Sequence, residues 1–311
     1  MGQKGELIVS RVRGGSDVWK FPVTGDPVEN ARSGVRITHQ TGHVQTLTVS
    51  PDESEVAFLS DNGGHSNVWI AGVRDGVMRP LTAEADPRVV IAVPFWSPRG
   101  DLIIFLSERK YGMKRYTLWT AKPDGTDIRD TSAQGAWVCW SGDGQWMYHS
   151  VGEKGVHQIR KVRTEGGNPV TVRTDNALGC AASRDGSALY YAGILTQATG
   201  TWDFEVRVAR PENGPSQVIG RLWGSRIPQR GLDVQFYLSP DGKWLAIPLI
   251  DGSTVNLWAL PTGGGDWRKL TAFSPRNVRI NRRIGWSKDS QHIYGAVLEV
   301  DSDIVMFSGL K

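Results

Sequence analysis

The stretch LSPDG, residues 238–242, decides the fold, because five variants of it recur along the chain. Pro at the second position of the serine turn fixes φ, Asp bonds to its own backbone and Gly accepts a positive φ, so the stretch predicts a tight reversal between two β-strands. The other copies read VSPDE (49–53), WSPRG (96–100), WSGDG (140–144), ASRDG (182–186) and WSKDS (286–290). Their serines, at positions 50, 97, 141, 183, 239 and 287, lie 47, 44, 42, 56 and 48 residues apart. A period of roughly 40 to 45 residues is typical of a four-stranded propeller blade.

Each turn is followed by a regular series of strand-like segments. A short β-branched or aromatic segment comes first, and a polar loop separates it from a segment with one bulky residue 18–23 positions after the serine. That bulky residue is Trp69, Trp119, Ile159, Val206, Trp258 or Val305. A fourth segment, such as RPLT (79–82) or RKLT (268–271), ends the unit. We therefore predict an all-β propeller of four-stranded antiparallel blades.

The two ends of the chain decide the predicted number of blades. Segments 6–10, 17–21 and 35–39 read as three strands without an inner strand before them, and the last unit stops after its third strand. With five complete units between them, this gives 26 strands. We favour seven blades, two of them incomplete, with six blades and two accessory strands as the alternative. A closed ring hides its edges, commonly by completing one blade from both chain ends.

The chain is expected to form a single propeller domain over residues 1–311. The expected inner strand of the first unit would precede Met1, as it would in the C-terminal part of a longer protein. No run of about 18 apolar residues and no secretory leader occurs, so the sequence as given predicts a cytoplasmic protein without a membrane span. A periplasmic location is expected if the chain is a fragment of an exported protein.

Composition excludes several other classes of protein. The chain has 39% hydrophobic and 22% charged residues, which disfavours disorder, and a net charge of +4, which permits anionic partners. It contains 37 Gly and 13 Trp, in keeping with many tight turns and an aromatic core. Cys139 and Cys180 are too few for a disulfide scaffold or a cysteine zinc site, and we expect buried thiols rather than a redox pair.

The turn, the Ile/Val-Trp segment and the Leu-Thr ending resemble the WD40-like repeats of the bacterial TolB-type β-propellers. The same repeats occur in the propellers of prolyl-oligopeptidase-type serine peptidases. The resemblance covers residues 6–310 and implies a scaffold used as a docking or ligand-binding platform. The Gly-x-Ser-x-Gly nucleophile elbow of the peptidases is absent from this sequence, so we expect a non-catalytic protein.

Loops carry the predicted function, because the strands are committed to blade packing. In a propeller the loops from fourth to first and from second to third strands share one face, and the serine turns lie on the other. Segments 107–116, 221–232 and 272–284 make this loop face basic, which predicts a protein or anionic ligand as partner of a monomer. Nucleic acid is not expected, because the arginines are not interleaved with stacking aromatics. The predicted binding residues are Trp202, Arg221, Trp223, Arg226, Arg230, Arg276, Arg279, Arg282 and Arg283.

Two alternatives remain open. His39, His43 and His65 fall in loops of the same face and could hold a divalent metal, as in a metal-dependent propeller lyase or hydrolase. Outside this alternative no cofactor is expected. The other alternative is a sensor or gating domain of a larger peptidase or kinase.

Overall fold

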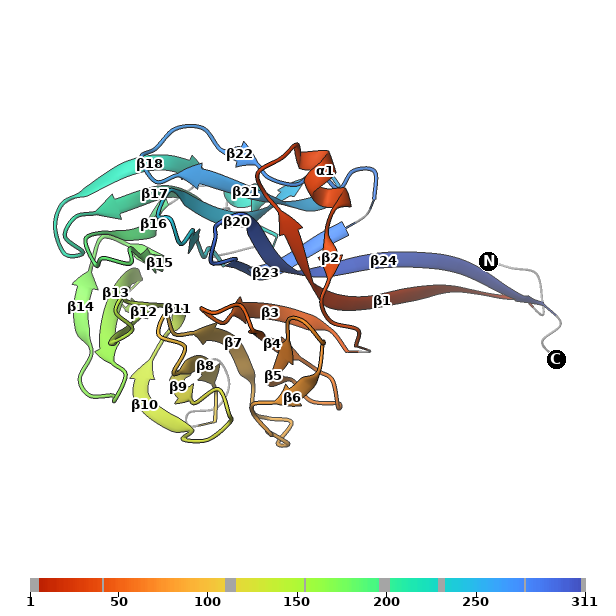
Figure 1. The fold of residues 1–311 in the computed structure, drawn as a ribbon, viewed down its shortest axis with the longest axis horizontal. Coiled ribbons are helices and arrows are strands. Elements are labelled where there is room, and N and C mark those ends of the chain that lie inside the picture. The colour runs from red at the N-terminus through yellow and green to blue at the C-terminus, as the bar shows by residue number, and fades with distance from the viewer. Residues whose placement is uncertain are drawn as a thin grey trace.

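The computed structural model describes residues 6–40, 42–109, 116–153, 155–195, 202–228, 233–276 and 278–308. Their strands form six four-stranded antiparallel blades arranged in a ring (Figure 1). Two blades belong to one eight-stranded sheet because Val255 of β21 and Arg279 of β23 form a parallel pair between them. The predicted all-β propeller is confirmed.

The blades follow one another in chain order. Blade 1 consists of β3 (Val44–Val49), β4 (Glu55–Ser60), β5 (Asn67–Gly72) and β6 (Met78–Pro80). Blade 2 consists of β7 (Ile91–Trp96), β8 (Ile103–Ser107), β9 (Thr117–Ala121) and β10 (Arg129–Gln134). Blade 3 consists of β11 (Ala136–Trp140), β12 (Trp146–Glu153), β13 (Val156–Arg163) and β14 (Val170–Arg173).

The remaining blades complete the ring. Blade 4 consists of β15 (Ala177–Ala182), β16 (Leu189–Leu195), β17 (Asp203–Ala209) and β18 (Ser216–Leu222). Blade 5 consists of β19 (Tyr237–Leu238), β20 (Trp244–Asp251), β21 (Thr254–Pro261) and β22 (Arg268–Lys269). Blade 6 consists of β23 (Val278–Trp286), β24 (His292–Ser308), β1 (Glu6–Pro22) and β2 (Val35–Arg36). The two short helices are α1 (Pro27–Arg32) and the 3-10 helix η1 (Gly224–Arg226).

The preference for seven blades is wrong, because within the described residues the two chain ends share one blade. The C-terminal segment supplies the two inner strands of blade 6, and the N-terminal segment supplies the two outer ones. Segments 6–10 and 303–307, predicted as separate strands, are continuations of β1 and β24. Residues 297–305 contain neither Gly nor Pro, so the chain can continue there as one strand, although Asp301, Ser302 and Asp303 are residue types common in turns.

The two strands of this closure form a long ribbon. β1 and β24 pair antiparallel from Glu6 opposite Ser308 to Pro22 opposite His292. Figure 1 shows that the ribbon of β1 and β24 extends away from the ring, and the pair of Glu6 and Ser308 stands at its far end. Ring closure therefore rests on continuous backbone pairing between the two ends of the chain.

A repeated polar contact in blades 1, 5 and 6 ties the segment that follows the outer strand to the third strand of the same blade. In blade 1, Asn67 Oδ1 accepts hydrogen bonds from Thr82 Oγ1 and the Glu84 N–H, both at 2.8 Å. Asn256 with Thr271 in blade 5, and Asp17 with Thr38 in blade 6, make the equivalent bonds. The threonine of the Leu-Thr ending is thus a buried anchor for the loop that leads to the next blade.

The serine turns have one geometry in all six blades. Each serine Oγ donates to an aspartate carboxylate at 2.5–2.7 Å and accepts the backbone N–H five residues further on. In blade 2 the acceptor is Asp101, because Arg99 occupies the usual aspartate position. The third residue after the serine has a positive φ in every turn, and at positions 100, 144, 186 and 242 it is a Gly. Glu53 and Ser290 adopt the same left-handed conformation without being glycines.

The two cysteines form a disulfide bond, so the expectation of buried free thiols is wrong. Cys139 is the last residue but one of β11, and Cys180 lies on β15, the inner strand of the next blade, with the two Cα atoms 5.8 Å apart. Inner strands of neighbouring blades converge around the axis, which brings two cysteines 41 residues apart in sequence within bonding distance. No helix among the described residues is long and apolar enough to cross a membrane.

His149 is a buried titratable group between blades 2 and 3. Only 1% of its surface is exposed, and neither ring nitrogen has a hydrogen-bond partner among the described residues. The backbone approaches it closely, since a Cβ on Gly135 would lie 2.6 Å from His149 Nδ1. Burial, with a contribution from the charge of Arg160, lowers the pKa of His149 to about 4, against a smaller opposing effect of the Gln134 backbone.

We expect Gly242→Ala to destabilise the protein by about 1 kcal/mol, because a Cβ is unfavourable at positive φ. Gly242 has φ 72° and no atom within 4 Å of a Cβ built there, so conformation alone is tested. Gly263→Ala is the matched control, since its Cβ also meets no atom and its φ lies outside the left-handed region. Urea unfolding measures both, and equal free energies of unfolding for the two variants would contradict the turn geometry.

We expect stability to fall as the pH decreases from about 6.5 to 4, through His149. The unfolded state binds a proton in this window and the folded state does not, so unfolding is favoured by about 3 kcal/mol at the acidic end. His157, whose pKa burial also lowers, contributes in the same direction. Urea unfolding at pH 7, 5.5 and 4.5 should show a shallower pH dependence for His149→Leu than for the wild type. An unchanged slope would exclude His149 as the source.

Candidate functional site

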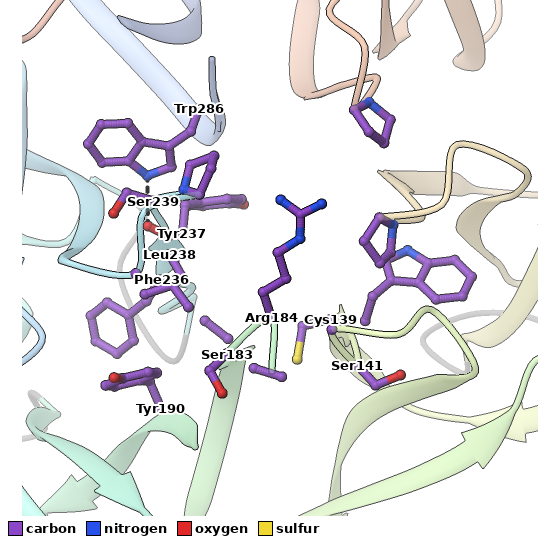
Figure 2. Close-up of a pocket in the computed structure, with 18 of the residues that line it drawn as sticks. Cys139, Ser141, Ser183, Arg184, Tyr190, Phe236, Tyr237, Leu238, Ser239 and Trp286 are labelled. Atoms are coloured by element: carbon purple, nitrogen blue, oxygen red, sulfur yellow. Dashed lines mark hydrogen bonds between the residues drawn. The ribbon is translucent and has the colours of Figure 1, made fainter. Parts of the chain in front are cut away.

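The six serine turns surround a cavity of about 600 Å³ at the centre of the ring. The residue after each turn serine borders it in every blade: Pro51, Pro98, Gly142, Arg184, Pro240 and Lys288. Figure 2 shows the cavity from close by, with inner-strand residues on its walls. This cavity thus lies on the face of the serine turns, opposite the loop face to which the sequence analysis assigned the function. A volume of this size suits a small ligand or a few residues of a peptide.

Aromatic residues narrow the cavity. Phe95 of blade 2 and Tyr237 of blade 5 stack with their ring centroids 6.2 Å apart, and both border the cavity. Blades 2 and 5 are opposite one another in a six-bladed ring, so this contact crosses the central channel. The indole N–H of Trp140 donates to the Phe95 carbonyl at 3.0 Å, and that of Trp286 donates to the Tyr237 carbonyl at 2.9 Å. These bonds hold the aromatic lining rigidly.

Carboxylates at the rim are already engaged within the turns. The serine hydroxyl is the largest cause that lowers the pKa of Asp52, Asp143 and Asp289, and it lowers that of Asp185 to about 2. At Asp241 burial opposes ionisation, but Ser239 and Lys243 keep its pKa below the ordinary value. These groups are ionised and hydrogen-bonded locally, so they are held in the turns rather than directed at a ligand.

Arg184 is the positive group that faces the cavity. Figure 2 shows its side chain extending from the blade 4 turn into the open space. Among the described residues its guanidinium has no ion-pair or hydrogen-bond partner, whereas Arg210, on the same wall, donates to Tyr190 Oη at 3.2 Å. Lys288, also exposed and without a side-chain partner there, adds a second positive charge from blade 6. The cavity therefore combines apolar walls with two cations, Arg184 and Lys288, that have no side-chain partner among the described residues, and with two carboxylates, Asp185 and Asp241, that are hydrogen-bonded within their turns.

The repeat contains a sequence signal for this cavity, at the residue that follows each turn serine. Four of the six turns carry Pro or Gly after the serine, and the two exceptions are the cations Arg184 and Lys288. A bulky charged side chain brings no advantage for turn formation at this position, where Pro is favoured. The departures from the repeat therefore mark the two charged residues among the six that border the cavity.

The arginines predicted on the loop face lie in different environments, and some of them are paired or buried. Asp233 pairs with both Arg282, at 3.2 Å, and Arg283, at 3.4 Å. Arg283 is buried, with 4% of its surface exposed, so this residue is a structural cation rather than part of an open binding surface. Arg276 and Arg279 are exposed, and Arg230 lies outside the described residues.

A corner of blade 4 brings three of the predicted residues together. Trp202 and Trp223 are 39% and 54% exposed, and Arg221 lies one residue before β18 ends at Leu222. Gly224 joins the two loops, because its N–H donates to Asp203 Oδ1 at 3.0 Å and a Cβ there would lie 1.9 Å from the Trp202 carbonyl oxygen. Arg226, in contrast, stacks on Trp258 at 4.3 Å from the ring centroid.

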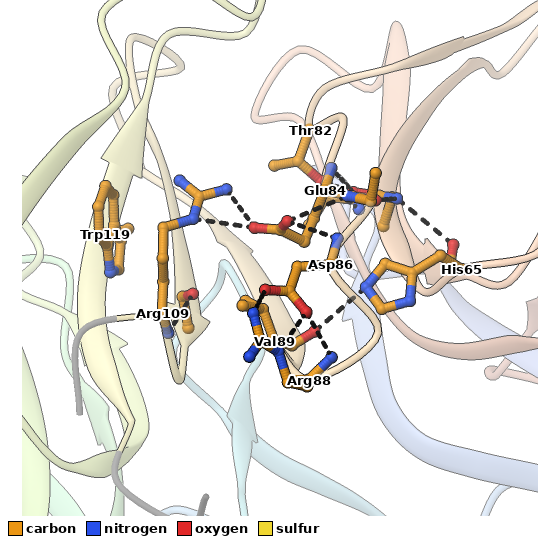
Figure 3. A network of polar contacts seen from close by, with 12 residues as sticks. His65, Thr82, Glu84, Asp86, Arg88, Val89, Arg109 and Trp119 are labelled. Carbon is orange, nitrogen blue, oxygen red and sulfur yellow. Dashed lines mark hydrogen bonds and ion pairs between the residues drawn. The ribbon is translucent and has the colours of Figure 1, made fainter. Parts of the chain in front are cut away.

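The basic character of a further loop is neutralised within the protein. Figure 3 shows Arg109 donating through Nε and Nη2 to Glu84 Oε2, at 2.9 and 2.6 Å, while it lies over the Trp119 ring. Burial opposes ionisation of Glu84, but the Asp86 N–H and Arg109 lower its pKa below the ordinary value. This contact links blades 1 and 2 and leaves little positive charge for a ligand.

The three histidines of the metal hypothesis do not form a site. His65 Nε2 lies 3.1 Å from the Val89 carbonyl oxygen in the network of Figure 3. In the described part of the chain, which includes His39, His43 and His65, no three His, Cys, Asp or Glu side chains lie close enough together to hold a metal ion.

Comparisons with known proteins identify the fold. No family model and no curated protein matches the sequence. Among solved structures, the chain is similar to one assigned as TolB from Agrobacterium tumefaciens, with 15% identity, a TM-score of 0.63, and coverage of 92% of this chain and 98% of that one. TolB from Acinetobacter baumannii is 12% identical with a TM-score of 0.61, and the match covers 92% of this chain but only 65% of that protein.

The propeller of a peptidase is also similar. An acylaminoacyl peptidase in complex with Z-Gly-Gly-Phe-chloromethyl ketone matches with 13% identity and a TM-score of 0.50, over 89% of this chain and 46% of that one. The expected resemblance to TolB-type and peptidase propellers is thus found in three dimensions. At such identities the likeness establishes the fold, and the activity has to be argued from the site.

Proposed function

We propose that this protein is a non-catalytic recognition module that binds an anionic ligand in the cavity of the serine-turn face. The observation that carries the proposal is the position of Arg184, whose guanidinium projects into a cavity of about 600 Å³ with no partner among the described residues. A guanidinium binds a carboxylate or phosphate through two parallel hydrogen bonds. The proposal keeps the anionic ligand predicted from the sequence and transfers it to the opposite face.

The apolar walls of the cavity indicate which chemical group the ligand carries besides its negative charge. Trp96, Trp140 and Phe236 border the cavity together with the rings of the turn prolines. Such walls favour a ligand with an aromatic or aliphatic body, because its burial removes apolar surface from water. An aromatic carboxylate, or a peptide segment with an acidic and an aromatic residue, has this chemistry.

The disulfide indicates the cellular compartment in which such a module would be found. Disulfides persist in oxidising compartments such as the bacterial periplasm and are rare in the cytosol. The Cys139–Cys180 bond therefore supports the exported alternative over the cytoplasmic expectation.

Arg184→Ala should weaken the binding of 2-naphthoate about tenfold or more, because it removes a charge-assisted hydrogen bond. Isothermal titration calorimetry measures the change, with neutral 2-naphthamide as the ligand control. Arg99→Ala is the matched variant, since Arg99 is an exposed turn arginine that pairs with Asp101 and does not border the cavity. Failure of the wild type to bind 2-naphthoate at millimolar concentration, or equal affinity in the Arg184 variant, would contradict the proposal.

The exposed tryptophan corner supports a second candidate, a docking surface for a protein. Exposed indoles held on a rigid backbone are typical anchors of protein interfaces. We expect Trp202→Ala with Trp223→Ala to change the free energy of unfolding by less than about 0.5 kcal/mol and to abolish capture of a partner from an extract of the source cells. Val218→Ala, at a residue 45% exposed on β18, is the control. Undiminished capture by the double tryptophan variant would reject this surface.

A further inference from the structure

The disulfide lies in the wall of the proposed binding cavity. Cys139 and Cys180 both border the cavity, from inner strands β11 and β15. These strands belong to separate sheets, so no ladder of backbone hydrogen bonds joins them. The S–S bond therefore links the inner strands of blades 3 and 4 covalently beside the cavity. Cys180 precedes Arg184 by four residues, on the strand that leads directly into its turn.

The two turns that follow the cysteines touch through their backbones. A Cβ built on Gly142 would lie 2.2 Å from the Arg184 carbonyl oxygen and 2.5 Å from the Ser183 carbonyl oxygen. A contact this close is sensitive to small displacements of either strand, because no flexible side chain can absorb them. The backbone of Arg184 is thus placed by the separation of β11 and β15, and the disulfide fixes that separation.

A second contact from the neighbouring blade supports the same strand. The side-chain amide of Gln235 donates to the Cys180 carbonyl, and this amide is buried. Cys180 is therefore held from blade 5 by a hydrogen bond and from blade 3 by the disulfide. Loss of the disulfide removes one of these two supports and leaves the other.

We propose that the Cys139–Cys180 disulfide is a positioning element for Arg184, so that affinity of the cavity for anions depends on the redox state of this bond. This inference rests on the proposed function of the cavity. Reduction by a dithiol such as dithiothreitol transfers two electrons and two protons. The S–S bond breaks to give the two cysteine thiols, and the dithiol closes to a cyclic disulfide.

A double-mutant cycle tests the proposal through the affinity for 2-naphthoate. The four proteins are the wild type, Cys139→Ser with Cys180→Ser, Arg184→Ala, and the triple variant. Removing the disulfide should weaken binding about fivefold to tenfold when Arg184 is present and less than twofold in the Arg184→Ala background. Dithiothreitol should reproduce the weakening in the wild type and have no effect on the double cysteine variant. An equal loss in both backgrounds, or no loss in either, would overturn the proposal.

Hydrogen exchange separates this inference from the proposed function. Reduction should speed amide exchange in residues 140–144 and 181–188, and leave the distant turn at 50–55 unchanged. If the wild type does not bind 2-naphthoate, the proposed function fails and exchange alone decides the positioning role. Uniform acceleration over all six turns would show general destabilisation instead, and unchanged exchange at 181–188 would also reject the positioning role.

Discussion

The hydrogen bond from serine to aspartate within each turn is the interaction on which the architecture depends. It reverses the inner strand of a blade within a few residues, and its repetition in six blades places six such reversals around one axis. Because the reversals are so short, the residue after each serine is left at the edge of the central space. The geometry that makes the blade therefore also makes the cavity, without any additional loop.

Two residues that depart from the repeat, Glu53 and Ser290, form contacts between the turns of neighbouring blades. Ser290 and Glu53 adopt a left-handed conformation at a position where four other turns have Gly, and both form contacts with the neighbouring turn. Ser290 Oγ accepts the Asp241 N–H at 3.1 Å, and the Glu53 carboxylate accepts from the Lys288 N–H and, at 3.1 Å, from Tyr294 Oη. These contacts lie on both sides of the blade 6 turn. Conformational strain at these two residues is thus offset by bonds that join the closing blade to its neighbours.

The sequence was sufficient to predict the four-stranded blade but not the number of blades in the ring. Turn chemistry and strand propensity are local, and the period of the serines is visible without a structure, so the four-stranded unit could be predicted. The number of blades depends on whether residues 6–22 and 292–308 each make one strand or two, which is settled by pairing between opposite ends of the chain. The disulfide was missed for the same reason, since β11 and β15 become neighbours only when consecutive blades pack around the axis, which spacing in sequence does not show.

The prediction of a loop-face site counted charges without their partners. The loop face holds many arginines, but Asp233 and Glu84 pair with three of them, so the number of guanidinium groups overstates the positive charge offered to a ligand. Arg184 is a single residue in a turn, and its guanidinium has no ion-pair or hydrogen-bond partner among the described residues, although the carboxylates of Asp185 and Asp241 also border the cavity. An anion gains most where the cation has no competing carboxylate and where apolar walls limit screening by water. By this criterion the proposed site at Arg184 is better suited to an anion than the paired Arg109, Arg282 and Arg283 of the opposite face.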